Sequence, residues 1–238
     1  MSPKRLVLLV EGQGDVEAVP LLLKRLLGEQ QAFDVVTPDP HPFRVGEFSK
    51  ISRQDFREWR RYLKAAAKRR NLGGCLLLLD GDSRAAVDGE PFCAMRAARR
   101  LAESARDAGG GSLFSVAIVF ACMEFESWLI AGAESLSGKS FADGRQELPE
   151  DLGPIPPDPE CAPRDAKRWF QGRLATGYKP ARDQAELTRL VDLRVIRHRQ
   201  MRSFRRLEHA VGQLIQAIRC GEHTVTPAPT SCSCPTRL

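Results

Sequence analysis

The sequence predicts an α/β protein in which a parallel sheet is flanked by helices and is followed by a mostly helical C-terminal extension. Three apolar runs, at residues 6–10, 75–79 and 115–121, are typical of strands that are covered on both faces. Segments with helical spacing of apolar residues lie between these runs. Alternation of strand and helix favours a parallel sheet with right-handed crossovers.

The elements follow this alternation along the chain. The first strand leads through an acidic Gly-containing turn into a helix whose apolar residues run from Val16 to Leu27. Residues 34–52 are rich in Pro, Asp, His and Gly and predict a loop, with or without a short strand. Helices are expected at residues 54–70 and 91–108, the second ending at Gly109.

The organisation of the chain is predicted from changes in composition. We expect a core at residues 1–135, a Pro-rich irregular connection at 136–163, and a helical extension packed on the core at 164–221. Residues 222–238 are polar and Pro-rich, which predicts a disordered tail.

Composition predicts a soluble, cytoplasmic protein with no membrane partner. No apolar run approaches the roughly 20 residues that a membrane helix needs. The first apolar run is short and enters an acidic turn, so it is interpreted as a buried strand and not as a signal peptide. Cys75, Cys93, Cys122 and Cys220 lie among apolar or helix-forming residues and are interpreted as reduced core cysteines.

The formal net charge of +6 favours acidic partners, of which nucleic acid is the usual one. The predicted helix at 54–70 carries Arg57, Arg60, Arg61 and Lys64 beside its apolar stripe. This basic side is either a solvated helix face or a surface that contacts phosphates. If this surface contacts phosphates, Arg84 is expected to contact them as well.

Each predicted strand is followed by acidic residues. The carboxyl ends of parallel strands meet at one edge of the sheet, where ligands bind. The acids at this edge are Glu11, Asp15, Asp80, Asp82, Glu124 and Glu126.

The spacing of Asp80 and Asp82 suits one hard cation, and Gly81 between them permits a close approach of the backbone. The acids therefore predict a site for Mg²⁺ or Mn²⁺, with a simple turn and helix cap as the alternative for this loop. On a forming helix, Glu124 and Glu126 would not share a face, so only one is expected to reach the metal. We favour Glu126, with Glu124 as an acid at the helix N-terminus.

The acidic motifs resemble those of the Toprim superfamily, the catalytic module of topoisomerases, primases and old-family nucleases. The glutamate motif matches at residues 10–15 and the DxD motif at residues 79–83, and the resemblance covers about residues 5–135. Segments at 164–167, 178–179 and 203–207 are similar to a small standalone Toprim-like family, the domain of unknown function 4276. Position 15, often Glu in relatives, is Asp here.

The resemblance implies a Toprim-like, Rossmann-like fold with Glu11 as acid, base or metal ligand and with Asp80 and Asp82 as metal ligands. It implies a nuclease that cleaves phosphodiester bonds, and a role in anti-phage or anti-plasmid defence with a partner ATPase. Lys179, in the matched segment, joins the expected nucleic-acid contacts.

The alternative function is a non-catalytic module that binds nucleotide or nucleic acid with a metal. DNA or RNA as substrate, one metal or two, activity without a partner, and a monomer or homo-oligomer all stay open.

Overall fold

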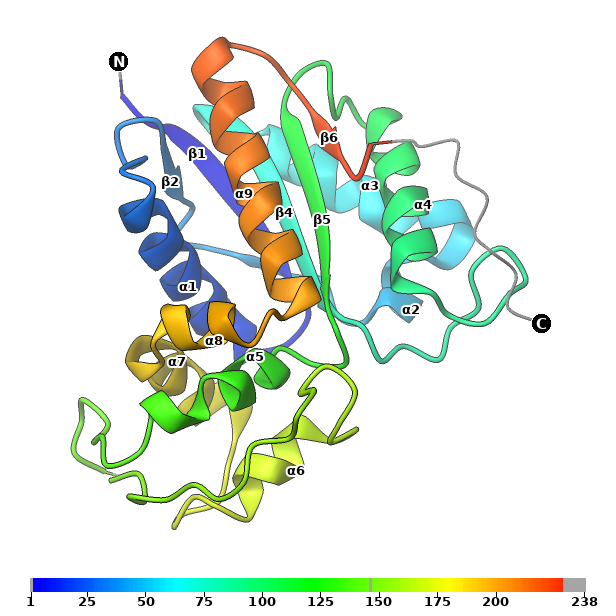
Figure 1. The fold of residues 1–238 in the computed structure, drawn as a ribbon. Coiled ribbons are helices and arrows are strands. Elements are labelled where there is room, and N and C mark those ends of the chain that lie inside the picture. Colours follow the sequence, from blue (N-terminus) through cyan, green and yellow to red (C-terminus); the bar gives the residue numbers. More distant parts are fainter. Residues whose placement is uncertain (1, 146, 229–238) are drawn as a thin grey trace.

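The computed structural model describes residues 2–145 and 147–228. This part of the chain holds one sheet of six strands in the order β2-β1-β4-β5-β6, with β3 also pairing with β1, and every pair is parallel (Figure 1). The strands are β1 (Lys4–Val10), β2 (Val36–Pro38), β3 (Phe43–Arg44), β4 (Leu72–Asp80), β5 (Ser115–Ala121) and β6 (Val225–Thr226).

Helices occupy most of the remaining chain. The first four are α1 (Asp15–Glu29), α2 (Phe48–Ile51), α3 (Arg53–Ala67) and α4 (Ala94–Arg106). Around the end of β5 and beyond lie α5 (Glu126–Ala131), the 3₁₀ turn η1 (Ala133–Ser135), α6 (Ala166–Gln171), α7 (Pro180–Leu190), α8 (Leu193–His198) and α9 (Arg202–Cys220). The predicted α/β fold and helical C-terminal part are confirmed.

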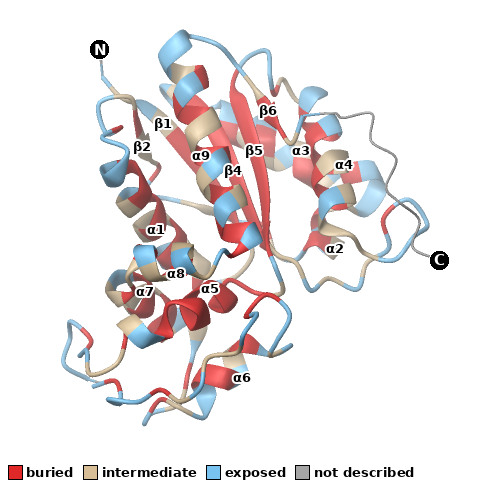
Figure 2. Ribbon diagram, viewed as in Figure 1, coloured by how far each residue is buried: buried red, intermediate tan, exposed pale blue. Residues whose placement is uncertain are grey.

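The sheet separates two hydrophobic cores because side chains alternate along each strand. Leu6 and Leu8 of β1 pack with α1 and α9 on one face, whereas Val7 and Leu9 pack with α2, α3 and α4 on the other. Both faces of the central strands are buried (Figure 2). This double coverage explains why the strands are continuously apolar.

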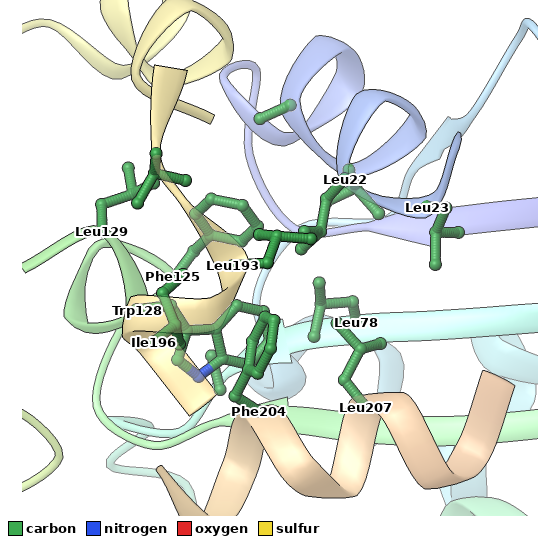
Figure 3. Packing of buried hydrophobic residues seen from close by; sticks show 14 of the residues in the cluster. Leu22, Leu23, Leu78, Phe125, Trp128, Leu129, Leu193, Ile196, Phe204 and Leu207 are labelled. Carbon is green, nitrogen blue, oxygen red and sulfur yellow. The ribbon is translucent and has the colours of Figure 1, made fainter. Parts of the chain in front are cut away.

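The C-terminal helices share the core of the sheet. Trp128 of α5 packs edge-on against Phe204 of α9 (Figure 3), with ring centroids 5.5 Å apart. The indole N–H of Trp128 donates to Ser203 Oγ at 2.8 Å. Leu193 and Ile196 of α8 belong to the same cluster (Figure 3). The segment from α5 to α8 is thereby held at the carboxyl ends of the strands (Figure 1).

The connections leave β1 and β4 toward opposite faces of the sheet. After β1 the chain enters α1, and after β4 it enters α4 on the other side. Such a reversal opens a crevice at the carboxyl ends of two neighbouring strands, and ligands of parallel α/β proteins bind there.

The structure differs from expectation at the C-terminus. The disordered tail was expected from residue 222, but Val225–Thr226 forms β6 and pairs with β5, and Val225 is buried. The pairing covers the edge of β5 that would otherwise expose unpaired backbone groups. Residues 229–238 of that expected tail lie outside the described residues.

The four cysteines expected in the core differ in exposure. Cys75 is buried and Cys93 is half-buried. Cys122 and Cys220 are exposed, because they lie just beyond β5 and at the end of α9. In the described part of the chain, no helix combines the length and apolar character required to cross a bilayer.

Candidate metal centre

The ends of β4 and β5 approach each other closely because Gly81 follows Asp80. A Cβ at Gly81 would lie 2.5 Å from the carbonyl oxygen of Ala121, and the Gly81 N–H donates to the Met123 carbonyl at 2.9 Å. A side chain here would separate the two strand ends. The expected close approach at Gly81 thus brings Asp80 beside the segment that carries Glu124 and Glu126.

Three carboxylates at these strand ends converge. Asp80, Glu124 and Glu126 each offer an oxygen, and these oxygens lie within 4.8 Å of one another. We call them the inner carboxylates. Glu124 and Glu126 are buried, and the Asp80 side chain is 15% exposed.

Each inner carboxylate is held at one oxygen by a donor of the protein itself. The N–H of Phe125 donates to Asp80 Oδ1 at 2.9 Å, and the N–H of Ala166 donates to Glu124 Oε2 at 2.8 Å. The hydroxyl of Tyr178 donates to Glu126 Oε1 at 2.8 Å. These bonds leave the second oxygen of each carboxylate for another partner.

That partner is the ammonium group of Lys167. Its Nζ lies 2.5 Å from Glu124 Oε1, 3.4 Å from Asp80 Oδ2 and 3.6 Å from Glu126 Oε2. The lysine side chain is 39% exposed, so it reaches the cluster from the solvent side. The inner carboxylates thus surround a position that a cation occupies.

Only one of Glu124 and Glu126 was expected to reach the metal, and which of them binds it stays a prediction, but the structure differs from the reason given for it. Both converge with Asp80, because α5 begins at Glu126 and residues 122–125 do not follow a regular helix; Met123 has a φ of 63°. Glu124 does accept N–H bonds at a helix start, but the helix is α6 and not α5.

The remaining three acids, Glu11, Asp15 and Asp82, form the outer carboxylates. Glu11 Oε2 accepts the N–H of Asp80 at 3.1 Å. Asp15 accepts the N–H of Gly12 at 2.8 Å and the amide of Gln184 at 2.7 Å. Asp82 is exposed. The described residues show no ion pair between an outer carboxylate and Lys167.

The contact between Asp15 and Gln184 depends on Gly14. A Cβ at Gly14 would lie 2.8 Å from the backbone of Pro180 and would collide with the Gln184 side chain. The bare glycine lets the start of α7 approach the turn after β1. In this way the C-terminal part of the chain contacts both groups of carboxylates.

Burial changes the acidity of the site. It raises the pKa of Glu11 to about 7, helped by the charges of Asp15 and Asp82 and opposed by the Asp80 N–H. Burial also raises the pKa of Glu126 to about 7 and that of Asp80 well above its usual range, against the attraction of Lys167. Burial of Lys167 favours its neutral form, but Glu126, Asp80 and Glu124 outweigh burial and raise the pKa of this ammonium.

A cavity of about 440 Å³ opens beside the carboxylates. Glu11, Glu47, Asp80 and Asp82 supply its carboxylates, and Lys167 and Arg84 add positive charge. Phe48, Ser49 and Ser83 complete much of the remaining wall. The cavity therefore joins candidate metal ligands to groups that can bind an anion.

The predicted nucleic-acid contacts lie in different places. Arg57, Arg61 and Lys64 are exposed on α3, whereas Arg60 is half-buried and donates to Ser104 Oγ of α4 at 3.0 Å. Lys179 is exposed immediately before α7. Of this set, the structure brings Arg84 alone into the lining of the cavity.

Sequence reasoning assigned no role to Lys167, Tyr178 or Gln184. They contact acids that are 41 to 169 residues away in the chain. Two signals were present: six acids at one edge require compensating donors from elsewhere, and Lys167 and Tyr178 lie in segments that resemble the family. Neither signal indicated which acid each residue would contact.

The donor set fits a divalent cation. Mg²⁺ and Mn²⁺ prefer oxygen ligands, and carboxylates are the usual charged ones. Each of the three carboxylates accepts a hydrogen bond at one oxygen and directs the other oxygen toward the Lys167 ammonium. The three oxygens around the ammonium already form a cation-binding arrangement.

Comparison with known proteins gives one match. Neither the curated proteins nor the solved structures contain a match to this chain. A family model described as "Domain of unknown function (DUF4276)" matches residues 10–212, which include every inner and outer carboxylate together with Lys167, Tyr178 and Gln184. The chain therefore belongs to the DUF4276 family.

Proposed function

We propose that this protein is a metal-dependent phosphodiesterase that cleaves nucleic acid, with a Toprim-type arrangement of acids. The observation that carries the proposal is the convergence of carboxylates from three strand ends beside one cavity. The location, at the crevice between β1 and β4, is where parallel α/β proteins bind their ligands.

The inner carboxylates are the proposed metal ligands. A Mg²⁺ or Mn²⁺ held by them would polarise a phosphate oxygen and lower the pKa of a coordinated water. Glu11 lines the cavity with a pKa of about 7, which suits a group that accepts and returns a proton near neutral pH. Asp82 lies at the exposed rim and adds negative charge to the metal side of the cavity.

The positive groups are the proposed phosphate contacts. Arg84 and Lys167 line the cavity itself. Arg57, Arg61 and Lys64 extend the basic surface along α3, which begins two residues after the cavity-lining α2. A nucleic-acid strand that follows α3 would place a phosphate at the cavity.

The resemblance to Toprim nucleases extends this proposal. By that analogy, the protein is the effector of a defence system against phage or plasmid DNA and acts with a partner ATPase. DNA and RNA are both substrates to test.

A second candidate function is a non-catalytic module that binds nucleotide or nucleic acid. One observation favours it: the Lys167 ammonium already compensates the inner carboxylates without a metal. A cluster that is paired in this way can also be structural.

The two candidates differ in the effect of Glu11→Gln. Gln preserves an oxygen that accepts the Asp80 N–H but cannot take up a proton. We expect cleavage of plasmid DNA or RNA with Mn²⁺ to fall by about 10²–10⁴-fold while binding is retained. A gel assay of cleavage and an anisotropy assay of binding measure the two effects.

The matched control is Glu17→Gln on the exposed side of α1. It removes the same charge outside the site and should leave cleavage unchanged. Cleavage by Glu11→Gln at the wild-type rate would refute the proposed mechanism. Binding without any cleavage by the wild-type protein, also with added ATPase partner, would favour the binding module.

The nucleic-acid surface is tested by replacing Arg57, Arg61 and Lys64 together with Gln. If all three contact phosphates, the slope of log affinity against log salt should decrease by about 2–3, since each contact contributes about 0.9 on duplex DNA. A salt titration of DNA binding measures this slope.

The control replaces Lys24, Arg205 and Arg219 with Gln, which removes the same charge from exposed positions of α1 and α9 on the opposite side of the sheet. Equal slopes for the two triple variants would exclude α3 from the interface.

A further inference from the structure

The three inner carboxylates form a tripod around Lys167. Asp80 Oδ1, Glu124 Oε2 and Glu126 Oε1 are fixed by Phe125, Ala166 and Tyr178. The opposite oxygens, Asp80 Oδ2, Glu124 Oε1 and Glu126 Oε2, are the three that lie near the lysine Nζ. The same three oxygens are therefore the ones free to bind a metal.

A metal and the ammonium group compete for this position. Mg²⁺ binds carboxylate oxygens at about 2.0–2.1 Å. The ammonium nitrogen lies 2.5–3.6 Å from the same oxygens, so the two cations cannot both be surrounded by them. A metal ion and an ammonium group held among the same three oxygens would also repel each other strongly, because solvent is largely excluded there. Occupation by one cation thus requires departure of the other.

Lys167 can leave without movement of the backbone. The chain at this point is anchored, because the N–H groups of Ala166 and Lys167 both donate to Glu124 Oε2. The side chain is 39% exposed and lines the cavity, so rotation of its four-carbon stem can carry the ammonium into open space. Ser49 and Arg84 line the same cavity and offer donors to a phosphate beside the displaced ammonium, and the carboxylates of Glu11, Glu47 and Asp82 line it as well.

We propose that Lys167 is an exchangeable internal cation, which a metal displaces from the inner carboxylates and which then binds a phosphate group of the substrate in the cavity. This inference rests on the proposed function and adds a regulation to it. Metal and phosphate each favour the displaced position of the lysine. Their binding is therefore positively cooperative, and the coupling is reciprocal. Without a phosphate ligand, the lysine keeps metal affinity low.

The experiment measures Mn²⁺ affinity of the full chain by calorimetry, with and without thymidine 5′-monophosphate. In the wild-type protein the nucleotide should raise Mn²⁺ affinity by about 5-fold or more, within the usual range of coupling. In Lys167→Met, Mn²⁺ alone should bind at least about tenfold more tightly than in the wild type, and the nucleotide should raise this affinity by a smaller factor than in the wild type, because only direct contact between metal and phosphate remains.

Two matched variants separate charge from position. Lys24→Met removes an exposed lysine of α1 and should behave as the wild type. Lys167→Arg retains a cation at the tripod and should keep Mn²⁺ affinity low. If Lys167→Met binds Mn²⁺ no more tightly than the wild type, the exchange is refuted.

A measurement on the wild-type chain covers the case in which Lys167→Met does not fold. Mg²⁺ should shift the NMR signal of the Lys167 ammonium, identified by its absence in Lys167→Arg; an unshifted signal at saturating Mg²⁺ would refute the exchange. If the wild type cleaves nucleic acid but Lys167→Met binds Mn²⁺ no more tightly, or the Lys167 signal does not shift, the exchange is refuted and the proposed function stands. Absence of metal binding in every variant would remove both proposals.

Discussion

The inner and outer carboxylates lie at one edge of the sheet but are compensated in different ways. Asp80, Glu124 and Glu126 share the ammonium of Lys167, whereas Asp15 has the uncharged amide of Gln184 and Glu11 a backbone N–H. Asp80 and Asp82 are two residues apart and yet fall into different groups. The short spacing of two acids in the sequence therefore does not decide whether both contact the same cation, here the ammonium of Lys167.

The difference follows from what surrounds each group. The inner carboxylates lie between the ends of β4 and β5 and the segment that starts α6, where few waters can reach them. Burial of charge in such a place requires a counter-charge. The outer carboxylates line the cavity or the turn after β1, where polar neighbours and solvent suffice.

The largest expected difference is between Asp80→Asn and Asp82→Asn. In Asp80→Asn, the new amide would keep an oxygen that accepts the Phe125 N–H and turn its NH₂ group toward the cation, so the site loses a charged ligand and gains a donor. We expect Mn²⁺ affinity to fall by about 100-fold or more, beyond the 10–100-fold typical of supporting residues. Asp82→Asn should reduce it by less than about 10-fold, because Asp82 lies outside the tripod.

Calorimetric titration of the two variants decides this comparison. Equal losses would mean that the DxD pair acts as one ligand set, and the division into inner and outer carboxylates would be wrong.

A smaller effect is expected from the residues that orient each group. Tyr178→Phe removes the O–H that holds Glu126, and Gln184→Leu removes the amide that holds Asp15. Each variant leaves a carboxylate oxygen without its donor, at a cost of about 1–3 kcal/mol in the free energy of unfolding. Only Tyr178→Phe should also lower Mn²⁺ affinity, by about 10–100-fold, since Glu126 is an inner carboxylate.

Thermal unfolding and metal titration of both variants measure the two quantities. Each variant is the control for the other, because Tyr178→Phe and Gln184→Leu should lose similar stability but only Tyr178→Phe should lose metal affinity. A reduction of metal affinity by Gln184→Leu as large as that by Tyr178→Phe would place Asp15 in the metal shell.

The smallest effect concerns pH. Burial raises the pKa of Glu11 and Glu126 from 4.5 to about 7 in the folded state, so the folded protein binds more protons than the unfolded chain between these values. The contribution of these groups to stability is therefore complete below about pH 4.5 and is lost as the pH rises through about 7. Metal affinity should change in the opposite direction, because the ligands must be deprotonated.

Denaturation of the metal-free protein between pH 4.5 and 8 tests the first statement, and Glu11→Gln should flatten the curve. A free energy of unfolding that rises with pH in the wild type and equally in Glu11→Gln would contradict the raised pKa of Glu11.

The strand ends were predictable because two independent signals coincide there. A continuous apolar run marks each central strand, and an acid directly after it has no role in the core. Glu11 and Asp80 were located in this way, and Gly81 was expected to permit close approach. The path of residues 122–125 was not predictable, because the left-handed conformation of Met123 depends on packing against neighbouring segments.

The sequence by itself determined the parallel sheet and the edge at which the acids gather, since the alternation of strands with helices and the apolar periodicity of each element are local properties of the chain. Only the tertiary structure decided which acids share a cation. The ammonium of Lys167 is 87 residues from Asp80, and its position follows from the packing of α5 to α9 against the sheet. No local pattern encodes a contact over that separation, because it forms only when distant apolar faces are buried together.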